Sequence, residues 1–362
     1  MAVALVVVGV GVAAAWVGGM LFTPEALRGW FDDSAERAEI AAAIKPTRVP
    51  LAWEAITIDM PPDRSSLDGL GGAAYADGRW VATGHPGILV SDDGRSWSVL
   101  PGPPGRDGRR LPYWPEAHDV AYGGGHWAVV GAGYAANSED GVSWQAHWQD
   151  VTQWEIQNAV AFGDGQFVAV GRQGAIFTSP DGATWTERDS GWNRELRDIA
   201  FGGGRWVVVS DAGLVLTSED GVRWTRRDST EHLRHLWGVA YGDGQFVAVG
   251  EAGVILTSAD GLAWTRQAGP SRASTWLVRD GSGQQLDISS AYAPNSLAAV
   301  AHGPDGWIAV GNYKYVITSP DGVNWTIRDQ TDVSLSAVAV SDRVWLGLGV
   351  GWTVLTRPVS AP

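Results

Sequence analysis

A seven-residue pattern, Ser-x-Asp-Gly-x-x-Trp, contains residue types that build catalytic and calcium-binding sites, and it occurs six times along the chain. A serine hydroxyl near a carboxylate is a starting point for nucleophilic catalysis, and aspartate followed by glycine is typical of calcium loops. The repeated carboxylates are Asp93, Asp140, Asp181, Asp220, Asp260 and Asp321. The tryptophans that end the copies are Trp97, Trp144, Trp185, Trp224, Trp264 and Trp325.

The number of copies favours a structural role for this pattern, which we call the box. A catalytic site is needed once in a chain, whereas repeats report architecture first. Calcium takes six to eight oxygen ligands, and most boxes offer one or two carboxylates. An aspartate can accept backbone N–H groups across its own turn, glycine tolerates a positive φ, and tryptophan buries a large apolar area. The box therefore predicts a repeated hairpin turn.

The boxes recur with a basal period near 40 residues, because their serines stand at positions 91, 138, 179, 218, 258 and 319. Each repeat holds four short runs of strand-like alternation, such as FVAVG and AIFTS, separated by turn signals such as GDG. Four antiparallel strands per repeat form one blade of a β-propeller, with the box between the third and fourth strands. The repeats are expected to start near residues 71, 119, 158, 198, 238, 299 and 337.

The last repeat lacks a fourth strand, and an earlier segment can supply it. The final repeat reaches Thr356 where the box serine is expected, and the chain stops before another strand. The segment Leu51 to Asp59 precedes the first full repeat, and its Trp53 matches the box tryptophan. Closing the ring removes exposed sheet edges. We therefore predict an all-β, seven-bladed β-propeller over residues 51–362, closed by residues 51–59 as an N-terminal strand.

The box resembles the Asp-box, or bacterial neuraminidase repeat (BNR repeat), found in sialidases, sortilin-type receptors and the photosystem II stability/assembly factor propellers. The resemblance covers about residues 51–357, and the context of the boxes is most similar to the assembly-factor-like propellers. It implies a non-enzymatic scaffold, structural or assembly subunit of a membrane-protein complex, photosynthetic or otherwise bioenergetic. The alternative that it leaves open is a cell-surface glycan-binding protein or a sialidase-like glycoside hydrolase.

Residues 1–22 are uncharged and mostly apolar, which is long enough to cross a bilayer as a helix. No lysine or arginine precedes the run, unlike a signal peptide, and it lacks the polar face of a core helix. We expect a single transmembrane anchor over residues 1–22, with a cleaved signal peptide as the alternative, followed by a short amphipathic helix and linker over residues 23–50. The predicted location is a bacterial cell membrane, with the propeller on the extracytoplasmic, periplasmic side.

The composition and the placement of tyrosine and histidine argue against several classes of partner and of reaction. The net charge of −14 argues against nucleic acid, which needs a basic surface. The absence of cysteine excludes disulfides and thiolate sites. A hydrolase of the sialidase type needs a tyrosine paired with a glutamate, whereas Tyr75, Tyr122 and Tyr241 occupy a packing position of the first strand. His232 and His235 have no evident third ligand. The prediction is therefore no enzyme activity, no cofactor and no metal.

The loops that join successive blades are the candidate interface, because they lie on one face of the disc together with the loops between second and third strands. Two of them are long, residues 101–118 and 269–297, and long loops are often functional. Tryptophan, tyrosine and arginine are enriched in interface hot spots. The candidate partner-binding residues are Arg106, Arg109, Arg110, Tyr113, Trp114, Trp148, Trp154, Trp192, Arg194, Arg197, Arg234, Trp237, Arg272, Trp276, Tyr313, Lys314, Tyr315 and Trp352. The alternative is that some of these rings cap the loops against the disc.

The predicted partners are thus an integral membrane protein complex, contacted by this loop face, and the lipid bilayer, contacted by the N-terminal helix. Because the domain is acidic, attraction to anionic lipid head groups is not expected to supply the docking contact.

Overall fold

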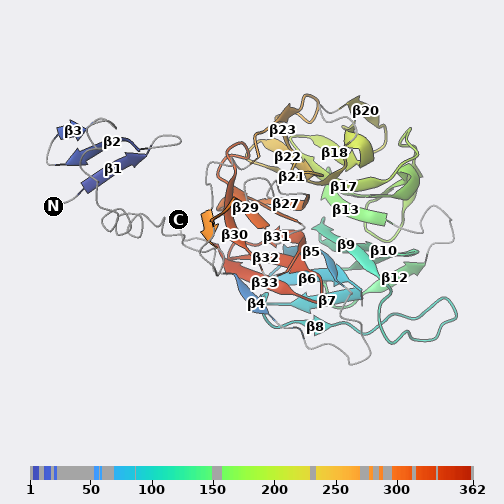
Figure 1. Cartoon of the computed structure of the whole chain (residues 1–362). Helices are drawn as coiled ribbons and strands as arrows, with labels where there is room; N and C mark the ends of the chain where they lie inside the picture. Colours follow the sequence, from blue (N-terminus) through green and yellow to red (C-terminus); the bar gives the residue numbers. More distant parts are fainter. Residues whose placement is uncertain are drawn as a thin grey trace. The chain divides into compact units, whose positions relative to one another are not determined.

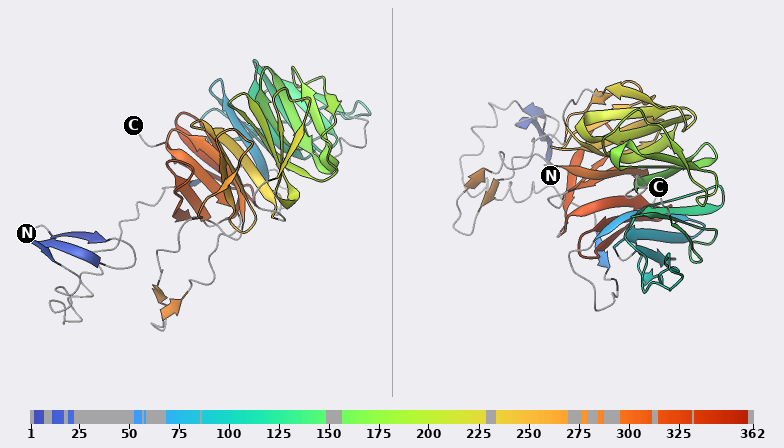
Figure 2. Two further views of the ribbon diagram at one scale, coloured as in Figure 1. Left: turned by 90° about the horizontal axis from the view of Figure 1, so that it is seen from above. Right: turned by 90° about the vertical axis from the view of Figure 1, so that its right-hand side faces the viewer.

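The computed structural model describes residues 53–56, 58, 69–85, 87–148, 157–228, 234–269, 296–311, 315–331 and 333–359, together with five short strands elsewhere that are described by their backbone alone. The described residues form seven four-stranded antiparallel sheets, which confirms the seven-bladed β-propeller. Figure 1 shows the blades in sequence order around the ring, and Figure 2 shows them from two further directions.

In blades 1 to 6 the strands run in sequence order from the centre of the ring to its rim (Figure 1). Blade 1 holds β5 (Leu70–Ala76), β6 (Arg79–Gly84), β7 (Gly87–Ser91) and β8 (Ser98–Val99); blade 2 holds β9 (Ala117–Gly123), β10 (His126–Gly131), β11 (Tyr134–Ser138) and β12 (Gln145–Trp148); blade 3 holds β13 (Gln157–Gly163), β14 (Gln166–Gly171), β15 (Ile176–Ser179) and β16 (Thr186–Arg188). Blade 4 holds β17 (Leu196–Gly202), β18 (Arg205–Ser210), β19 (Leu214–Ser218) and β20 (Thr225–Asp228); blade 5 holds β21 (Leu236–Gly242), β22 (Gln245–Gly250), β23 (Ile255–Ser258) and β24 (Thr265–Arg266). Blade 6 holds β27 (Leu297–Gly303), β28 (Gly306–Gly311), β29 (Tyr315–Ser319) and β30 (Thr326–Gln330).

Blade 7 is assembled from both ends of the propeller sequence. It holds β31 (Leu335–Val340), β32 (Val344–Gly349), β33 (Val354–Pro358) and, at its outer edge, β4 (Glu54–Ile56). The pairing of β33 with β4 is antiparallel, with Val354 opposite Ile56. The innermost strands contact one another all the way around, and β31 contacts β5. The N-terminal closing strand is therefore confirmed, and its paired part is shorter than the predicted residues 51–59.

The core lies between the blades and is built on the second strand of each. These strands are buried along almost their whole length, as in β14, where every residue after the first is buried. An aromatic residue at the second position of this strand fills the space between neighbouring sheets. The residues at this position are Trp80, Trp127, Phe167, Trp206, Phe246, Trp307 and Trp345, and none is more than 1% exposed. Burial of such large rings stabilises each blade.

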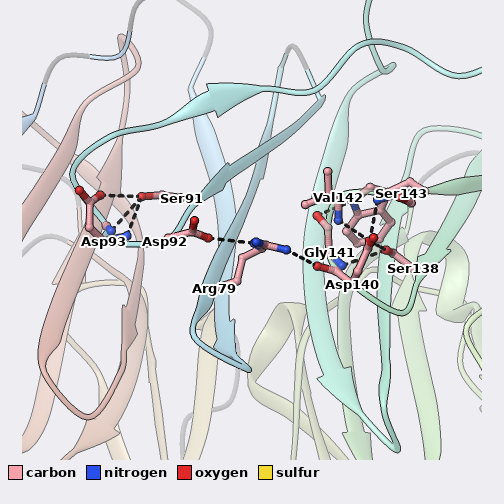
Figure 3. Close-up of polar contacts among 11 residues, drawn as sticks. Arg79, Ser91, Asp92, Asp93, Ser138, Asp140, Gly141, Val142 and Ser143 are labelled. Atoms are coloured by element: carbon pink, nitrogen blue, oxygen red, sulfur yellow. Dashed lines mark hydrogen bonds and ion pairs between the residues drawn. The ribbon is translucent and has the colours of Figure 1, made fainter.

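Each box closes its hairpin by bonding to itself, as blade 2 illustrates (Figure 3). Ser138 Oγ donates to Asp140 Oδ1 at 3.0 Å, and the same oxygen accepts the backbone N–H groups of Val142 and Ser143 at 2.8 and 2.7 Å. Trp144 Nε1 donates to the carbonyl of Gly141 at 2.8 Å. The backbone N–H groups of Ser143 and Val142 hold the pKa of Asp140 well below its usual range. The Asp140 carboxylate therefore accepts hydrogen bonds from residues of its own turn.

Side chains at the start of the second strand tie the box turns of neighbouring blades together. Arg79 donates from Nη1 to the carbonyl of Asp140 in blade 2 at 2.6 Å, and from Nε to Asp92 in its own blade at 3.0 Å (Figure 3). Gln166 Nε2 and Gln245 Nε2 occupy the same position in blades 3 and 5. They donate to the carbonyls of Asp220 and Asp321 in the following blades, at 2.8 and 2.7 Å.

Blade 7 lacks the box, and different contacts hold its outer edge. Thr356 stands at the position of the box serine and is 2% exposed, but no described residue bonds to its hydroxyl. Arg357 forms an ion pair with Asp305 of blade 6 at 3.0 Å, with both side chains largely buried. Arg95 of blade 1 forms an exposed ion pair with Glu54 at 2.7 Å. Ion pairs therefore link blade 7 to blade 6 and, through β4, to blade 1.

The N-terminal segment carries three short strands, β1 (Val3–Val7), β2 (Val12–Val17) and β3 (Met20–Phe22), which form a sheet in that order. A further pair, β25 (Leu277–Arg279) and β26 (Gln285–Asp287), lies in the second long loop. The amphipathic helix predicted over residues 23–50 lies outside the described residues, and of the predicted transmembrane segment over residues 1–22 only the backbone of these three strands is described. Within the described part of the chain, the structure has no helix with the length and apolarity needed to span a bilayer.

Candidate functional site

The loop face lies at the end of the blades opposite the boxes, because every antiparallel hairpin reverses the chain. It holds the connections between blades and those between second and third strands. Several sequence candidates lie outside the described residues, or have only their backbone described. These are Trp154, Arg272, Trp276, Tyr313, Lys314 and the side chain of Tyr315.

The connection from blade 1 to blade 2 folds into a hairpin of its own, residues 101–113, which we call the arginine hairpin (Figure 1, loop between β8 and β9). Pro104 and Arg110 face each other in an isolated antiparallel bridge. The backbone N–H of Gly105 donates to the carbonyl of Arg109 at 2.7 Å. These bonds give the loop a defined shape that carries its arginines at the tip.

A row of aromatic rings attaches this hairpin to blade 2. Trp148 Nε1 donates to the carbonyl of Pro104 at 3.1 Å, and the Arg106 guanidinium carbon lies 5.8 Å from the centroid of the Trp148 ring. Tyr134 lies between Trp148 and Trp114, with centroid separations of 5.8 and 5.7 Å. Trp114 is 4% exposed. Its indole therefore packs the base of the hairpin, as in the alternative that the sequence left open.

A second feature of the loop face lies where blade 3 meets blade 4. Trp192 is half-buried, with the guanidinium carbons of Arg226 and Arg194 at 5.0 and 5.9 Å from its ring centroid. Such distances are typical of cation–π contacts. An open pocket of about 400 Å³ lies beside the indole. The pocket is lined by Gln173, Gly174, Ala175, Glu187, Arg188, Asp189, Ser190 and Trp192.

Arg197 belongs to a chain of ion pairs that, with one histidine–aspartate contact, crosses three blades on the same face. Its Nε lies 2.9 Å from Asp211, and its Nη2 lies 3.3 Å from Glu195. Arg172 approaches Glu195 at 3.9 Å, and His235 approaches Asp211 at 2.9 Å. Arg172 and Asp211 begin two short 3₁₀ turns, η2 (Arg172–Gly174) and η3 (Asp211–Gly213). The guanidinium of Arg197 thus has carboxylate partners within the protein.

The other described candidates differ in exposure. Trp352 is 7% exposed and belongs to the core cluster between blades 7 and 1. Its φ of 61° is in the left-handed region, in the tight turn between β32 and β33. Arg234 and Trp237 are half-buried at the entry to β21, and Tyr113 is half-buried in the arginine hairpin. The exposed candidates among the described residues are therefore Arg106, Arg109, Arg110 and Arg194.

The centre of the ring holds two carboxylates that sequence reasoning missed. Asp119 and Asp198 lie on the innermost strands of blades 2 and 4. Asp119 Oδ2 accepts the backbone N–H of Val160 in blade 3 at 2.9 Å, and Asp198 Oδ2 accepts that of Val239 in blade 5 at 2.8 Å. Gly72 makes room for Asp119, because a Cβ at this glycine would collide with the Asp119 carboxylate.

Burial raises the pKa of Asp119 to about 7, against the N–H of Val160 that lowers it, and the negative charge of Asp198 adds to the rise. Burial likewise raises the pKa of Asp198 to about 6. The signal in the sequence was an aspartate at a position where the other five blades have glycine or alanine. Each carboxylate joins neighbouring inner strands and titrates near neutral pH.

The tyrosines of the inner strands pack as the sequence predicted. The rings of Tyr75, Tyr122 and Tyr241 lie 5.0, 4.8 and 4.8 Å from the aromatic residue on the adjacent second strand. Tyr122 also donates its hydroxyl to Asp77 of blade 1. Among the described residues, no group of three histidine, aspartate or glutamate side chains is placed to hold a metal ion.

No protein-family model matches the sequence, and no curated protein matches it either. The similarity to solved structures is extensive. YCF48 bound to a D1 peptide superimposes with a TM-score of 0.62 at 17% identity, over 85% of this chain and 95% of that chain. YCF48 from Cyanidioschyzon merolae superimposes with a TM-score of 0.59 at 13% identity, over 84% of this chain and 98% of that chain.

An enzyme is equally similar in backbone. Virginiamycin B lyase from Staphylococcus aureus superimposes with a TM-score of 0.63 at 10% identity, over 85% of this chain and 99% of that chain. Identities this low carry the fold and leave the site residues unassigned. The chain is thus similar in fold to both a peptide-bound propeller and a lyase, and this fold is the seven-bladed β-propeller.

Proposed function

We propose that the protein is a non-enzymatic scaffold or assembly subunit that docks on a membrane-protein complex through its loop face. The observation that carries this proposal is the difference between the two ends of the disc. The end that carries the boxes repeats one turn, whose hydrogen bonds are made within the turn itself. The loop face holds features that occur once among the described residues, namely the arginine hairpin and the contact of Trp192 with Arg226 and Arg194. Partly buried aromatic rings beside arginines are typical of interface hot spots.

The similarity to YCF48 supports a protein partner, because that propeller was obtained with a D1 peptide bound. For the present chain the proposed partner is an integral membrane complex of photosynthetic or related bioenergetic type. The N-terminal segment is proposed to anchor the propeller to a bacterial membrane, with the disc on the periplasmic side. Anchoring in the membrane plane raises the effective concentration of the loop face next to such a partner.

The test is gentle detergent extraction of the full-length protein, followed by identification of the proteins that co-purify. The Trp192→Ala, Arg194→Ala double variant should recover at most about one tenth of the partner, since truncating a hot-spot anchor typically costs at least about 2 kcal/mol of binding. Val222→Ala, at an exposed position of the blade 4 box, is the matched control and should keep the partner. A wild-type preparation that brings down no membrane protein would overturn the scaffold role.

An enzyme is the second candidate function, favoured by the similarity to virginiamycin B lyase. A catalytically inactive variant of that lyase was crystallised with quinupristin, which supplies a substrate to test. A panel of sialosides tests the glycosidase alternative. Turnover of either substrate that is lost on His235→Ala or Arg197→Ala would favour an enzyme, because both residues lie in the ion-pair chain of the loop face.

A further inference from the structure

The arginine hairpin concentrates positive charge on a strongly acidic protein. Arg106, Arg109 and Arg110 fall within five residues, and all three are exposed. The Arg109 side chain is 89% exposed. The whole chain carries a net charge of −14, so the tip is a positively charged site on a protein that is negatively charged overall. A cluster of positive charge on an acidic protein attracts an anionic group to that place.

The tip is held in shape before any partner binds. The carboxylate Oδ1 of Asp107 accepts the backbone N–H of Arg109 at 3.0 Å, and the N–H of Gly108 donates to the carbonyl of Gly105 at 2.9 Å. Below the tip, Trp148 donates to the carbonyl of Pro104. The backbone entropy of the loop is therefore lost on folding, which lowers the cost of binding a ligand to it.

We propose that the tip of the arginine hairpin binds an acidic, extended segment of a partner protein. This inference rests on the proposed docking function and specifies the chemistry of one contact. The guanidinium group presents a planar fork of donors that matches a carboxylate, and three such groups in a short turn fit successive acidic side chains. Asp107 approaches Arg109 only at 3.9 Å, so its carboxylate leaves the outer donors of that guanidinium available.

The charge of the rest of the protein selects a narrow partner over a broad one. A membrane surface or a nucleic-acid duplex would bring extended negative charge close to an acidic disc, and the two would repel each other. The Debye length is about 8–10 Å at physiological ionic strength, so a thin peptide can reach the tip while the rest of the disc is screened from it. Charge complementarity therefore favours a flexible acidic peptide.

The test measures binding of a fluorescein-labelled deca-glutamate peptide to the full-length protein in neutral detergent, by fluorescence anisotropy between 25 and 300 mM NaCl. Arg109→Glu should weaken binding about tenfold at the lowest salt, and the difference should shrink as salt rises, because contacts between exposed charges are screened. Arg343→Glu is the matched control. Arg343 is 85% exposed on blade 7 and lies 3.5 Å from Asp342, as Arg109 lies 3.9 Å from Asp107, so the change in net charge is the same and each variant loses one contact with an aspartate.

Binding that is weakened by Arg109→Glu and retained by Arg343→Glu supports the proposal. Equal losses in the two variants, or no binding at 25 mM NaCl, would overturn it. Arg109-dependent binding to phosphatidylglycerol vesicles that exceeds binding to the peptide would also overturn it, in favour of a lipid surface. If the membrane complex still co-purifies with the Arg109→Glu protein, the proposed docking function stands, and only the proposed contact at the arginine hairpin is rejected. If the complex is absent from the wild type, the proposed function fails whatever the peptide does.

Discussion

Blade 7 differs from the other six blades in how its outer strand is held. In blades 1 to 6 the fourth strand follows the third through a box turn, so a few neighbouring residues determine the outer edge. In blade 7 the fourth strand is β4, which comes from the other end of the propeller sequence and pairs over three residues. The boxes make each blade locally complete, whereas the ring as a whole depends on one contact between distant segments.

The difference shows which residues carry local and which carry global stability. A box aspartate stabilises its own turn, and a neighbouring blade is tied to it through a side chain such as Arg79. In blade 7, the largely buried ion pair of Arg357 with Asp305 provides a link to blade 6. Repeat proteins behave approximately as sums of unit and interface stabilities. Closure of the ring adds a contribution to the free energy of unfolding that no single repeat provides.

Truncation of the closing strand should give the largest change in the free energy of unfolding. Removal of residues 1–60 deletes β4 and the buried Ile58, so the free energy of unfolding should fall by about 3–5 kcal/mol through lost apolar burial and strand hydrogen bonds. Removal of residues 1–45 keeps β4 and should leave the stability of the propeller unchanged. Thermal and urea unfolding of the two truncations measure the difference. If both unfold alike, β4 does not stabilise the ring.

A pH effect should distinguish Asp119, on the inner strand of blade 2, from the exposed Asp342 of blade 7. Asp119 of blade 2 has a folded pKa of about 7, above the ordinary 3.8, so the folded state holds this proton more tightly than the unfolded chain. Its contribution to stability is therefore present at low pH and is lost as pH rises from about 4 to about 7. Asp119→Asn should stabilise the protein at pH 8, and the gain should shrink steadily toward pH 4.

Urea unfolding at pH 4, 6 and 8 measures this effect. The exposed Asp342 of blade 7 supplies the control, since Asp342→Asn should show no comparable gain at pH 8. A stability difference between Asp119→Asn and wild type that stays constant with pH would mean that folding does not raise the pKa of Asp119.

The smallest expected effects compare the box with its counterpart in blade 7. Asp140→Ala leaves two backbone N–H groups without their carboxylate and should cost about 1–2 kcal/mol. Thr356→Val removes a buried hydroxyl for which no described residue is a partner, at nearly constant volume, and should be neutral or stabilising by about 1 kcal/mol. Chemical denaturation resolves changes of opposite sign. A loss in both variants would indicate that Thr356 has a polar partner.

The fold was predictable because its signals are repeated. Six boxes, a second-strand aromatic in every blade and the match of Trp53 to the box tryptophan each point to the same architecture. Local preference and global packing agree at these positions, so single residues could be assigned from their spacing. The closing strand was predictable for the same reason, since one strand was missing at one end of the repeat array and one was in excess at the other.

The loop face was less predictable because its residues occur once. Residue type alone did not distinguish Trp114, which packs under the arginine hairpin, from Arg194, which is exposed. Arg197 was predicted as a partner contact, but its carboxylate neighbours come from different connections and meet only in the folded ring. Asp119 was missed because its bond to Val160 joins two blades 41 residues apart. Such pairings depend on the tertiary arrangement, and the departure of Asp119 from the glycine or alanine of the other blades does not by itself identify its partner.

The closing strand also sets the order of events when the chain is made. β4 is synthesised before any complete blade, yet its partner β33 is the last strand of the propeller to leave the ribosome. At about 5–20 residues per second, the roughly 300 residues between them take about 15–60 seconds to translate. For that time β4 has no partner strand, and its length of three residues, one of them the charged Glu54, limits its ability to recruit another chain. The propeller can therefore assemble blade by blade during synthesis, but it becomes a ring only after synthesis is nearly complete.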